Sequence, residues 1–224
     1  MAKGKQVRTT RLESLTDAVF GFSIALLMVS IEVPTDFQGL IDAMKGFAGF
    51  ALSFAMLILV WVYHYRFFKH YKLEDGITIL LNSVLLFVVL FYVFPLKYMF
   101  SVIATMISGV FPVTFDEVAV LMAIYSAGFA AVFVVFALMY LHAYRKREEL
   151  SLSVEEASSA AEHVGNCLVM AGVGVFAVTL ALVLPSPWAG PVAGFSFFLI
   201  APAQLINSRV FGRRRALRAD EEPG

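Results

Sequence analysis

The stretch R-L-E-S-L-T-D-A-V-F-G-F-S-I-A-L-L-M-V-S-I-E-V-P, residues 11–34, decides the fold class of this chain. Arg11, Glu13 and Asp17 place three charges in its first seven residues, and the fourteen residues 18–31 then carry none. About 20 consecutive apolar residues are enough for a helix to cross the hydrocarbon core of a bilayer. The stretch therefore predicts a membrane-spanning helix that keeps a carboxylate within its first two turns.

The composition of the whole chain agrees with this interpretation. Of its 224 residues, 60% are hydrophobic and 15% are charged, and the mean hydropathy is +0.81. A soluble domain is nearer to about 45–50% apolar and about 25% charged. We therefore expect an all-α, polytopic membrane protein whose surroundings are the lipid bilayer. The net charge of zero does not suggest a nucleic-acid partner, and the single Cys167 cannot form an intrachain disulfide.

Six segments are long and apolar enough to be membrane spans. They are expected at residues 12–33, 44–67, 77–99, 117–142, 162–184 and 188–209. The first run is too long for a signal peptide and lacks a small-residue cleavage site, so we expect it to be retained. Pro185-Ser186-Pro187 predicts a tight turn between the last two spans, and Ser153-Val154-Glu155-Glu156 predicts a helix start by its capping-box pattern. We expect a six-helix membrane domain over 1–210 and a polar tail over 211–224.

The basic residues predict the orientation in the membrane. With these six spans, 15 of the 17 lysines and arginines fall on one side, and only Lys45 and Lys97 fall on the other. Loops rich in lysine and arginine stay in the cytosol. The chain is therefore expected to be a multi-pass protein of the cell membrane with both termini in the cytosol.

Polar residues of the first two spans are expected at the same depth. Asp17 would lie roughly 8 Å inside the cytosolic end of its span, where a lone charge is unfavourable. The second span returns to that side through Trp61 and His64, which can both donate hydrogen bonds. We expect a hydrogen-bond cluster that anchors the first helix, formed by Arg11, Thr16, Asp17, Trp61 and His64. The alternative is a hydrated Asp17 and a Trp61 that belongs to an interfacial aromatic belt.

Helical periodicity separates a second face of the first span. At about 100° per residue, Phe22, Leu26 and Val29 lie within roughly 60° of one another, and Asp17 lies about 140° from Phe22. If the Asp17 face packs on the second helix, the Phe22 face must contact something else. Periodicity alone leaves lipid and another helix open.

Two motifs carry a resemblance to a known family. Arg11-x-x-x-Leu15-Thr16-Asp17, followed by an apolar helix, resembles the first-helix signature Arg-x-x-x-Phe-Ser-Asp of the transmembrane protein 175 family. Trp61-x-x-His64 resembles the Trp-x-x-His of that family's second helix. The two motifs cover about 30 residues, and the expected six-span layout covers the whole chain.

The resemblance implies a potassium-permeable cation channel, a homotetramer in which the first helices line the axis. It implies that bulky apolar side chains form the constriction, at the positions of Phe22, Leu26 and Val29, and that potassium ions are the permeant species. No T-V-G-Y-G filter loop occurs in the chain. The sequence departs from the family pattern at Leu15 and Thr16, at Phe22, and at Ala25, where the family carries a pore-facing hydroxyl; the last two put selectivity for potassium over sodium in doubt.

Other functions compete with the channel hypothesis. A membrane redox protein could bind haem or a metal through two of the histidines at the expected cytosolic side, which are His64, His70, His142 and His163. A secondary transporter is the other alternative, but transporters place charged or broken-helix elements at mid-depth, where these spans are nearly free of charge. The chain has no G-x-S-x-G or H-E-x-x-H pattern, so we expect no enzyme activity, no cofactor and no metal site.

Overall fold

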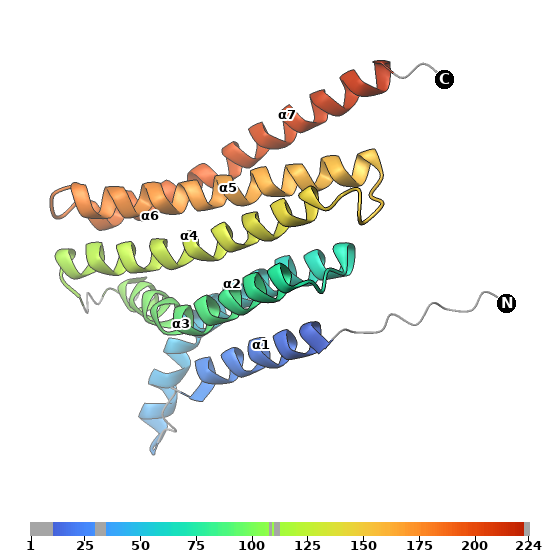
Figure 1. Ribbon diagram of the computed structural model, residues 1–224. Helices are drawn as coiled ribbons and strands as arrows, with labels where there is room; N and C mark the ends of the chain where they lie inside the picture. The colour runs from blue at the N-terminus through green and yellow to red at the C-terminus, as the bar shows by residue number, and fades with distance from the viewer. Residues whose placement is uncertain (1–10, 30–34, 108, 110–112, 222–224) are drawn as a thin grey trace.

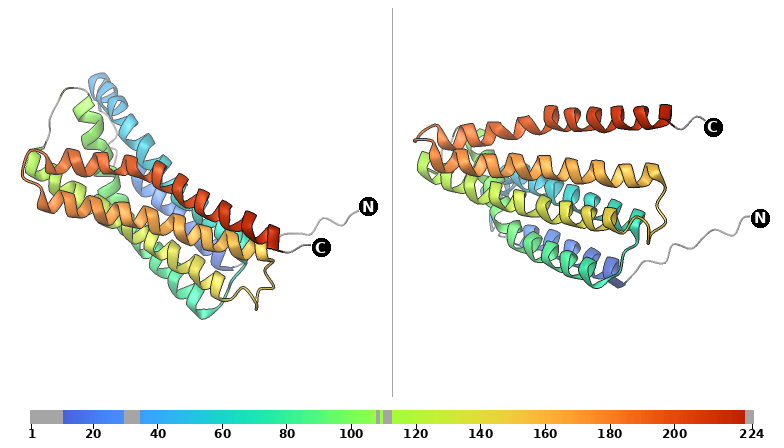
Figure 2. Two further views of the ribbon diagram at one scale, coloured as in Figure 1. Left: turned by 90° about the horizontal axis from the view of Figure 1, so that it is seen from above. Right: turned by 45° about the horizontal axis from the view of Figure 1, so that its top comes forward.

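The computed structural model describes residues 11–29, 35–107, 109 and 113–221, and all regular structure in these ranges is helical (Figure 1). The elements are α1 (Arg11–Val29), α2 (Phe37–Tyr71), α3 (Gly76–Ile107), α4 (Phe115–Arg145), α5 (Val154–Val183), α6 (Ala189–Ser196), the 3₁₀-helix η1 (Phe197–Leu199) and α7 (Ile200–Glu221). Successive long helices run in opposite directions, with α6, η1 and α7 following one another in one direction. The start of α1 and the end of α7 therefore lie at the same end of the bundle (Figures 1 and 2).

Five helical stretches of the described chain are long and apolar enough to cross a membrane. They are Gly49–Tyr71, Gly76–Ile103, Phe115–Arg145, Val154–Val183 and Ala189–Gly212. Helix α1 has 19 described residues, carries three charges in the first seven, and is not among these five. The structure thus supports a polytopic membrane protein; a sixth crossing by α1 and the cytosolic location of the termini stay predictions.

Several helices begin earlier than the expected spans. Helix α2 starts at Phe37 rather than near 44, and α5 starts at Val154 rather than near 162. The predicted capping box is confirmed, because the Ser153 hydroxyl accepts from the Glu156 amide and the Glu156 carboxylate accepts from the Ser153 amide. Residues 30–33 of the first expected span lie outside the described residues.

The last expected span is divided by η1. Pro202 lies in the first turn of α7, where a helix tolerates proline because that amide needs no intrahelical partner. The predicted turn at 185–187 separates α5 from α6. Helix α7 continues to Glu221, beyond the expected boundary at 210, so the polar tail is helical as far as it is described. The division into a membrane domain and a tail stays a prediction.

The core is centred on α4, which supplies more of the buried apolar side chains than any other described helix, and α4 and α5 pack on each other more extensively than any other pair of described helices. Small residues permit this approach: a Cβ atom added at Gly174 would lie 2.9 Å from the Ala130 Cβ. Aromatic rings fill the side of α4 that faces α2, where Tyr63 meets Phe133 edge to face with 5.4 Å between ring centroids. Helix α1 contacts only α2 and α3 among the described helices, so it lies at the edge of the bundle (Figure 1).

Candidate functional site

One face of α1 is buried against α2 and α3. Thr16, Phe20, Ser23 and Leu27 are each no more than 2% exposed, and their spacing of four, three and four residues follows one side of a helix. The hydroxyls of Thr16 and Ser23 donate to the carbonyls of Leu12 and Val19, one turn back. The side of α1 that meets α2 and α3 is therefore closely packed, and its two hydroxyl groups are hydrogen-bonded.

The opposite face of α1 carries the residues expected to form a constriction. Phe22 is 59% exposed and Leu15 is 55% exposed, and Ala25 is exposed beside them. Leu26 is half-buried and packs against the core. Val29 ends the described part of α1, and its side chain lies outside the described residues. Phe22 thus points away from α2 and α3, the helices that α1 packs against.

The first half of the anchoring cluster is a hydrogen bond between α1 and α2. The Trp61 indole Nε1 donates to Asp17 Oδ1 at 2.9 Å. The indole also stacks on Tyr65, with 5.6 Å between ring centroids. This pair lies at the exposed side of the α1–α2 contact, and it gives the carboxylate near the start of α1 the partner that its position requires.

The second half is a buried chain of hydrogen bonds that includes α3. His64 Nε2 lies 2.8 Å from Asn82 Oδ1, and Asn82 Nδ2 donates to Thr16 Oγ1 at 3.0 Å. Because the amide oxygen can only accept, His64 must donate from Nε2. The Thr16 hydroxyl in turn donates a hydrogen bond to the Leu12 carbonyl, so each of these bonds has one donor and one acceptor.

The expected five-residue cluster is thus divided into two. Asp17 pairs with Trp61, and Thr16 is joined to His64 through Asn82. Arg11 is exposed at the start of α1, and no hydrogen bond between described residues joins it to either group. Asn82, on α3, is the residue that joins Thr16 to His64, and the sequence did not indicate these partners.

A lysine that the expected site omits also contacts α1. Lys97 Nζ, on α3, donates to the Leu27 carbonyl at 3.2 Å. Lys97 is the single charged residue of the apolar stretch Gly76–Ile103, and this isolation is the signal that could have singled it out. Helix α1 is therefore fixed to α3 near both ends of its described length.

The four histidines have separate neighbours. His64 binds Asn82, and His142 Nε2 lies 2.7 Å from Asp75 Oδ2. His163 stacks on Tyr140, and His70 meets Tyr71 edge to face. No group of three or more histidine, cysteine or acidic side chains that could hold a metal ion occurs in the described ranges.

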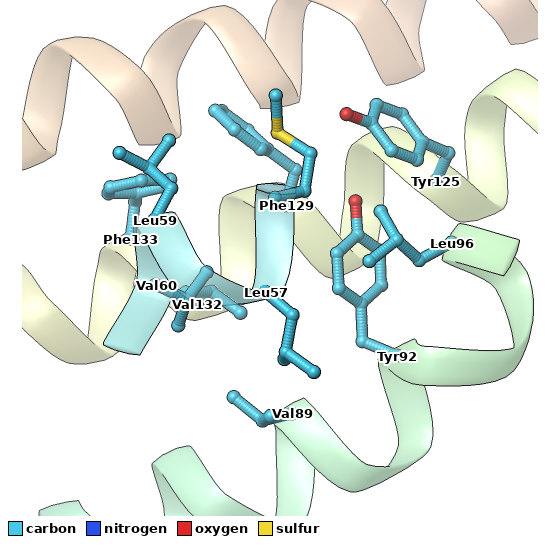
Figure 3. Close-up of a pocket in the computed structure, with 11 residues that line it drawn as sticks. Leu57, Leu59, Val60, Val89, Tyr92, Leu96, Tyr125, Phe129, Val132 and Phe133 are labelled. Atoms are coloured by element: carbon cyan, nitrogen blue, oxygen red, sulfur yellow. The ribbon is translucent and has the colours of Figure 1, made fainter. Parts of the chain in front are cut away.

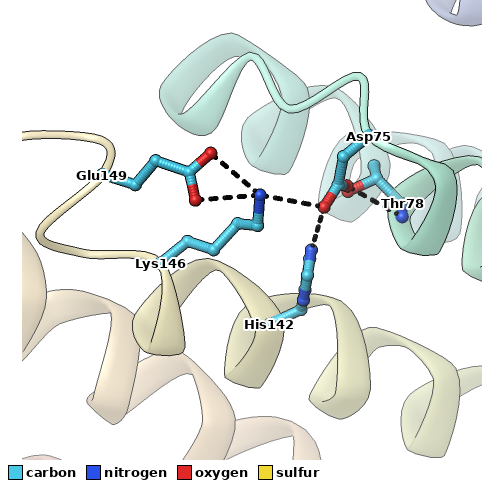
Figure 4. A network of polar contacts seen from close by, with 5 residues as sticks. All are labelled: Asp75, Thr78, His142, Lys146 and Glu149. Atoms are coloured by element: carbon cyan, nitrogen blue, oxygen red, sulfur yellow. Dashed lines mark hydrogen bonds and ion pairs between the residues drawn. The ribbon is translucent and has the colours of Figure 1, made fainter.

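A polar network joins the α2–α3 connection to the end of α4 (Figure 4). Asp75 accepts hydrogen bonds from the amide and hydroxyl of Thr78 and from His142, and it pairs with Lys146 at 3.2 Å. Burial favours the neutral carboxyl, but the bonds from Thr78, His142 and Lys146 outweigh it. The pKa of the Asp75 carboxyl therefore lies well below its usual range.

The pocket between α2, α3 and α4 is apolar (Figure 3). Its 11 lining residues include Leu57, Val89 and Phe129, and none of the 11 is charged. The two tyrosines that line it, Tyr92 and Tyr125, have rings 5.7 Å apart. The pocket therefore offers no charged side chain to a bound ion.

Comparison with known proteins identifies the family. The family model described as "Endosomal/lysosomal potassium channel TMEM175" matches residues 11–92, which contain both motifs and Asn82. A potassium channel of Marivirga tractuosa is 33% identical over 227 residues, covering 95% of this chain and 90% of that protein. The chain belongs to the TMEM175 family. The resemblance that the two motifs predicted is confirmed.

Other TMEM175 relatives agree with this assignment. A potassium channel of Chamaesiphon minutus is 32% identical over 99 residues, which cover 41% of this chain and 49% of that protein. The crystal structure of a single-substitution variant of the potassium channel MtTMEM175, in complex with a nanobody–MBP fusion, superposes with a TM-score of 0.83 at 32% identity, covering 93% of this chain and 96% of that one. A TMEM175 homologue from Chamaesiphon minutus superposes with a TM-score of 0.57 at 24% identity, covering 88% and 96%, and shares the fold. These relatives are channels, which are not a class of enzyme.

Proposed function

We propose that this chain is one subunit of a homotetrameric, potassium-permeable channel of the cell membrane. The first helices of four copies would surround the axis, with Phe22, Leu26 and Val29 forming an apolar constriction. The support is the family membership and the potassium channels that resemble this chain over almost its whole length.

The exposed Phe22 is the observation that carries the proposal. Its ring is 59% exposed on the side of α1 opposite Thr16 and Phe20, and no other described helix covers that side. A phenylalanine buries about 150–250 Å² when it is covered. Lipid would cover it only on the outside of an assembly, whereas a ring of four α1 helices would turn it toward the axis.

Such a ring would control ions by excluding water. A narrow apolar constriction empties of water and stops hydrated cations without any charged barrier. The channel would open when α1 rotates or tilts far enough for water to return. The bonds of Asp17 and Thr16 would hold the base of α1 on α2 and α3 while the Phe22 region moves. Ala25 adds no hydroxyl to this path, so we expect weak discrimination between potassium and sodium.

The test is potassium flux from liposomes that contain the wild-type protein, Phe22→Ala or Phe22→Asn. Both variants widen or wet the constriction, so flux should rise several-fold. Phe198→Ala is the matched control, because Phe198 is 75% exposed on η1, which makes no contact with α1. Unchanged potassium flux in both Phe22 variants would mean that Phe22 does not line the conduction path. The mass of the detergent-solubilised particle should equal four chains, and a particle of one chain would refute the assembly.

A further inference from the structure

Lys97 places a positive charge beside the backbone of the proposed constriction. Its Nζ donates to the Leu27 carbonyl at 3.2 Å, and Leu27 lies between Leu26 and Val29 in the sequence. The side chain is half-buried, and Leu27 is 0% exposed. Lys97 therefore reaches α1 from behind, on the face opposite Phe22.

This contact leaves the charge in place. A carbonyl oxygen is a neutral acceptor, and an ammonium group has three donors. The salt bridges between described residues do not include Lys97. A charge is unfavourable in an apolar span and is usually tied to function there. A glutamine or an apolar residue would pack in the same stretch without that penalty, so the charge itself calls for an explanation.

We infer that the charge of Lys97 limits cation flow through the constriction by electrostatic repulsion. The inference rests on the proposed function, because four copies would put four ammonium groups around the apolar ring. The interaction of each charge with a passing cation is strong in low-dielectric surroundings and weakens as salt is added. The lysine also joins α3 to α1, so any loosening of that contact must be separated from the effect of charge.

Three substitutions separate charge from attachment. Lys97→Arg keeps the charge and the donors, Lys97→Gln keeps a donor without the charge, and Lys97→Met keeps neither. Single-channel potassium conductance is measured in planar bilayers at about 10 mM and about 1 M KCl, where the Debye length falls from roughly 30 Å to roughly 3 Å. Each variant is first checked for the wild-type elution volume, so that only assembled protein is compared.

The inference predicts a salt-dependent increase. Lys97→Gln and Lys97→Met should raise conductance three-fold or more at low salt and less than 1.5-fold at high salt, while Lys97→Arg stays within 1.5-fold of wild type at both. An increase of the same size at both salt concentrations would mean that Lys97 only attaches α1, and unchanged conductance would mean that its charge does not reach the path; either overturns the inference. If wild type and Phe22→Ala both conduct no potassium, the proposed function itself has failed, which is a distinguishable result.

Discussion

Asn82 donates a hydrogen bond of 3.0 Å to the hydroxyl of Thr16, although 66 positions separate them in the chain. Through its amide oxygen Asn82 also accepts from His64, so one side chain joins α1, α2 and α3. Asn82 and Thr16 are 0% exposed and His64 is 2% exposed. In this conformation a buried polar contact, together with apolar packing, sets the rotation of α1 about its own axis and so decides where Phe22 points.

Replacing Asn82 with leucine should destabilise the protein. The change keeps the size of the side chain but leaves His64 Nε2 without an acceptor and Thr16 without one of its donors. An unsatisfied buried polar group costs about 1–3 kcal/mol, and hydrogen bonds between membrane helices average about 0.6 kcal/mol. We expect the free energy of unfolding to fall by about 1–2 kcal/mol, measured by thermal unfolding in detergent and followed by tryptophan fluorescence.

Ser83→Ala is the control for the Asn82 variant. Ser83 is the next residue, lies toward the outside of α3, and bonds only to the Ile79 carbonyl of its own helix. Removing this hydroxyl should change the free energy of unfolding by less than about 0.5 kcal/mol. If Asn82→Leu unfolds at the same temperature as Ser83→Ala, the chain from His64 to Thr16 contributes nothing to the stability of the bundle.

The sequence predicted the helices better than their contacts. Lengths of apolar residues, the prolines at 185 and 187 and the Ser153 capping box were enough to locate the long helices and the turn after α5, but the start of α2 and the end of α7 were missed. Matching depths across the bilayer also brought Asp17 to Trp61, which are hydrogen-bonded. The depth of a residue in the bilayer, however, does not say toward which helix its side chain points. Asn82 and Lys97 face α1 because of the rotation of α3 about its axis, which depends on packing with every neighbouring helix. The last span is expected as one continuous segment, 188–209, and its division at η1 was not predicted.

The Asp75 network should make stability depend on pH. The pKa of the folded carboxyl lies well below the value of about 3.9 for an aspartate in an unfolded chain. As the pH falls through that ordinary value, the unfolded state takes up a proton that the folded state does not, so the free energy of unfolding decreases. The stabilisation that the Asp75 carboxylate provides is complete above the pKa of the unfolded chain, and it is lost as the pH falls toward the pKa of the folded state.

Asp75→Asn tests this dependence. Asparagine keeps an oxygen that can cap α3 through the Thr78 amide but removes the charge that faces His142 and Lys146. We expect stability to fall by about 1 kcal/mol at pH 7, with the gap to wild type shrinking as the pH is lowered from about 5 to 3. Glu74→Gln, at the exposed neighbouring position, should leave both the stability and its pH profile unchanged. A gap that stays constant over this range would show that the carboxylate is not stabilised by its partners.

Two glycines of α5, two residues apart, should respond oppositely to the same substitution. At Gly174 an added Cβ would lie 2.9 Å from the Ala130 Cβ and 3.1 Å from the Ser126 carbonyl oxygen, and neither atom belongs to a flexible side chain. At Gly172 the same atom would meet nothing within 4 Å. Overpacking costs about 1–3 kcal/mol, and alanine gains up to about 1 kcal/mol over glycine in a helix.

Thermal unfolding should therefore show Gly174→Ala about 1 kcal/mol less stable than wild type and Gly172→Ala equal or up to about 1 kcal/mol more stable. Equal stability of the two variants would contradict the prediction, because it would mean that α4 and α5 can move apart at Gly174 without losing stability.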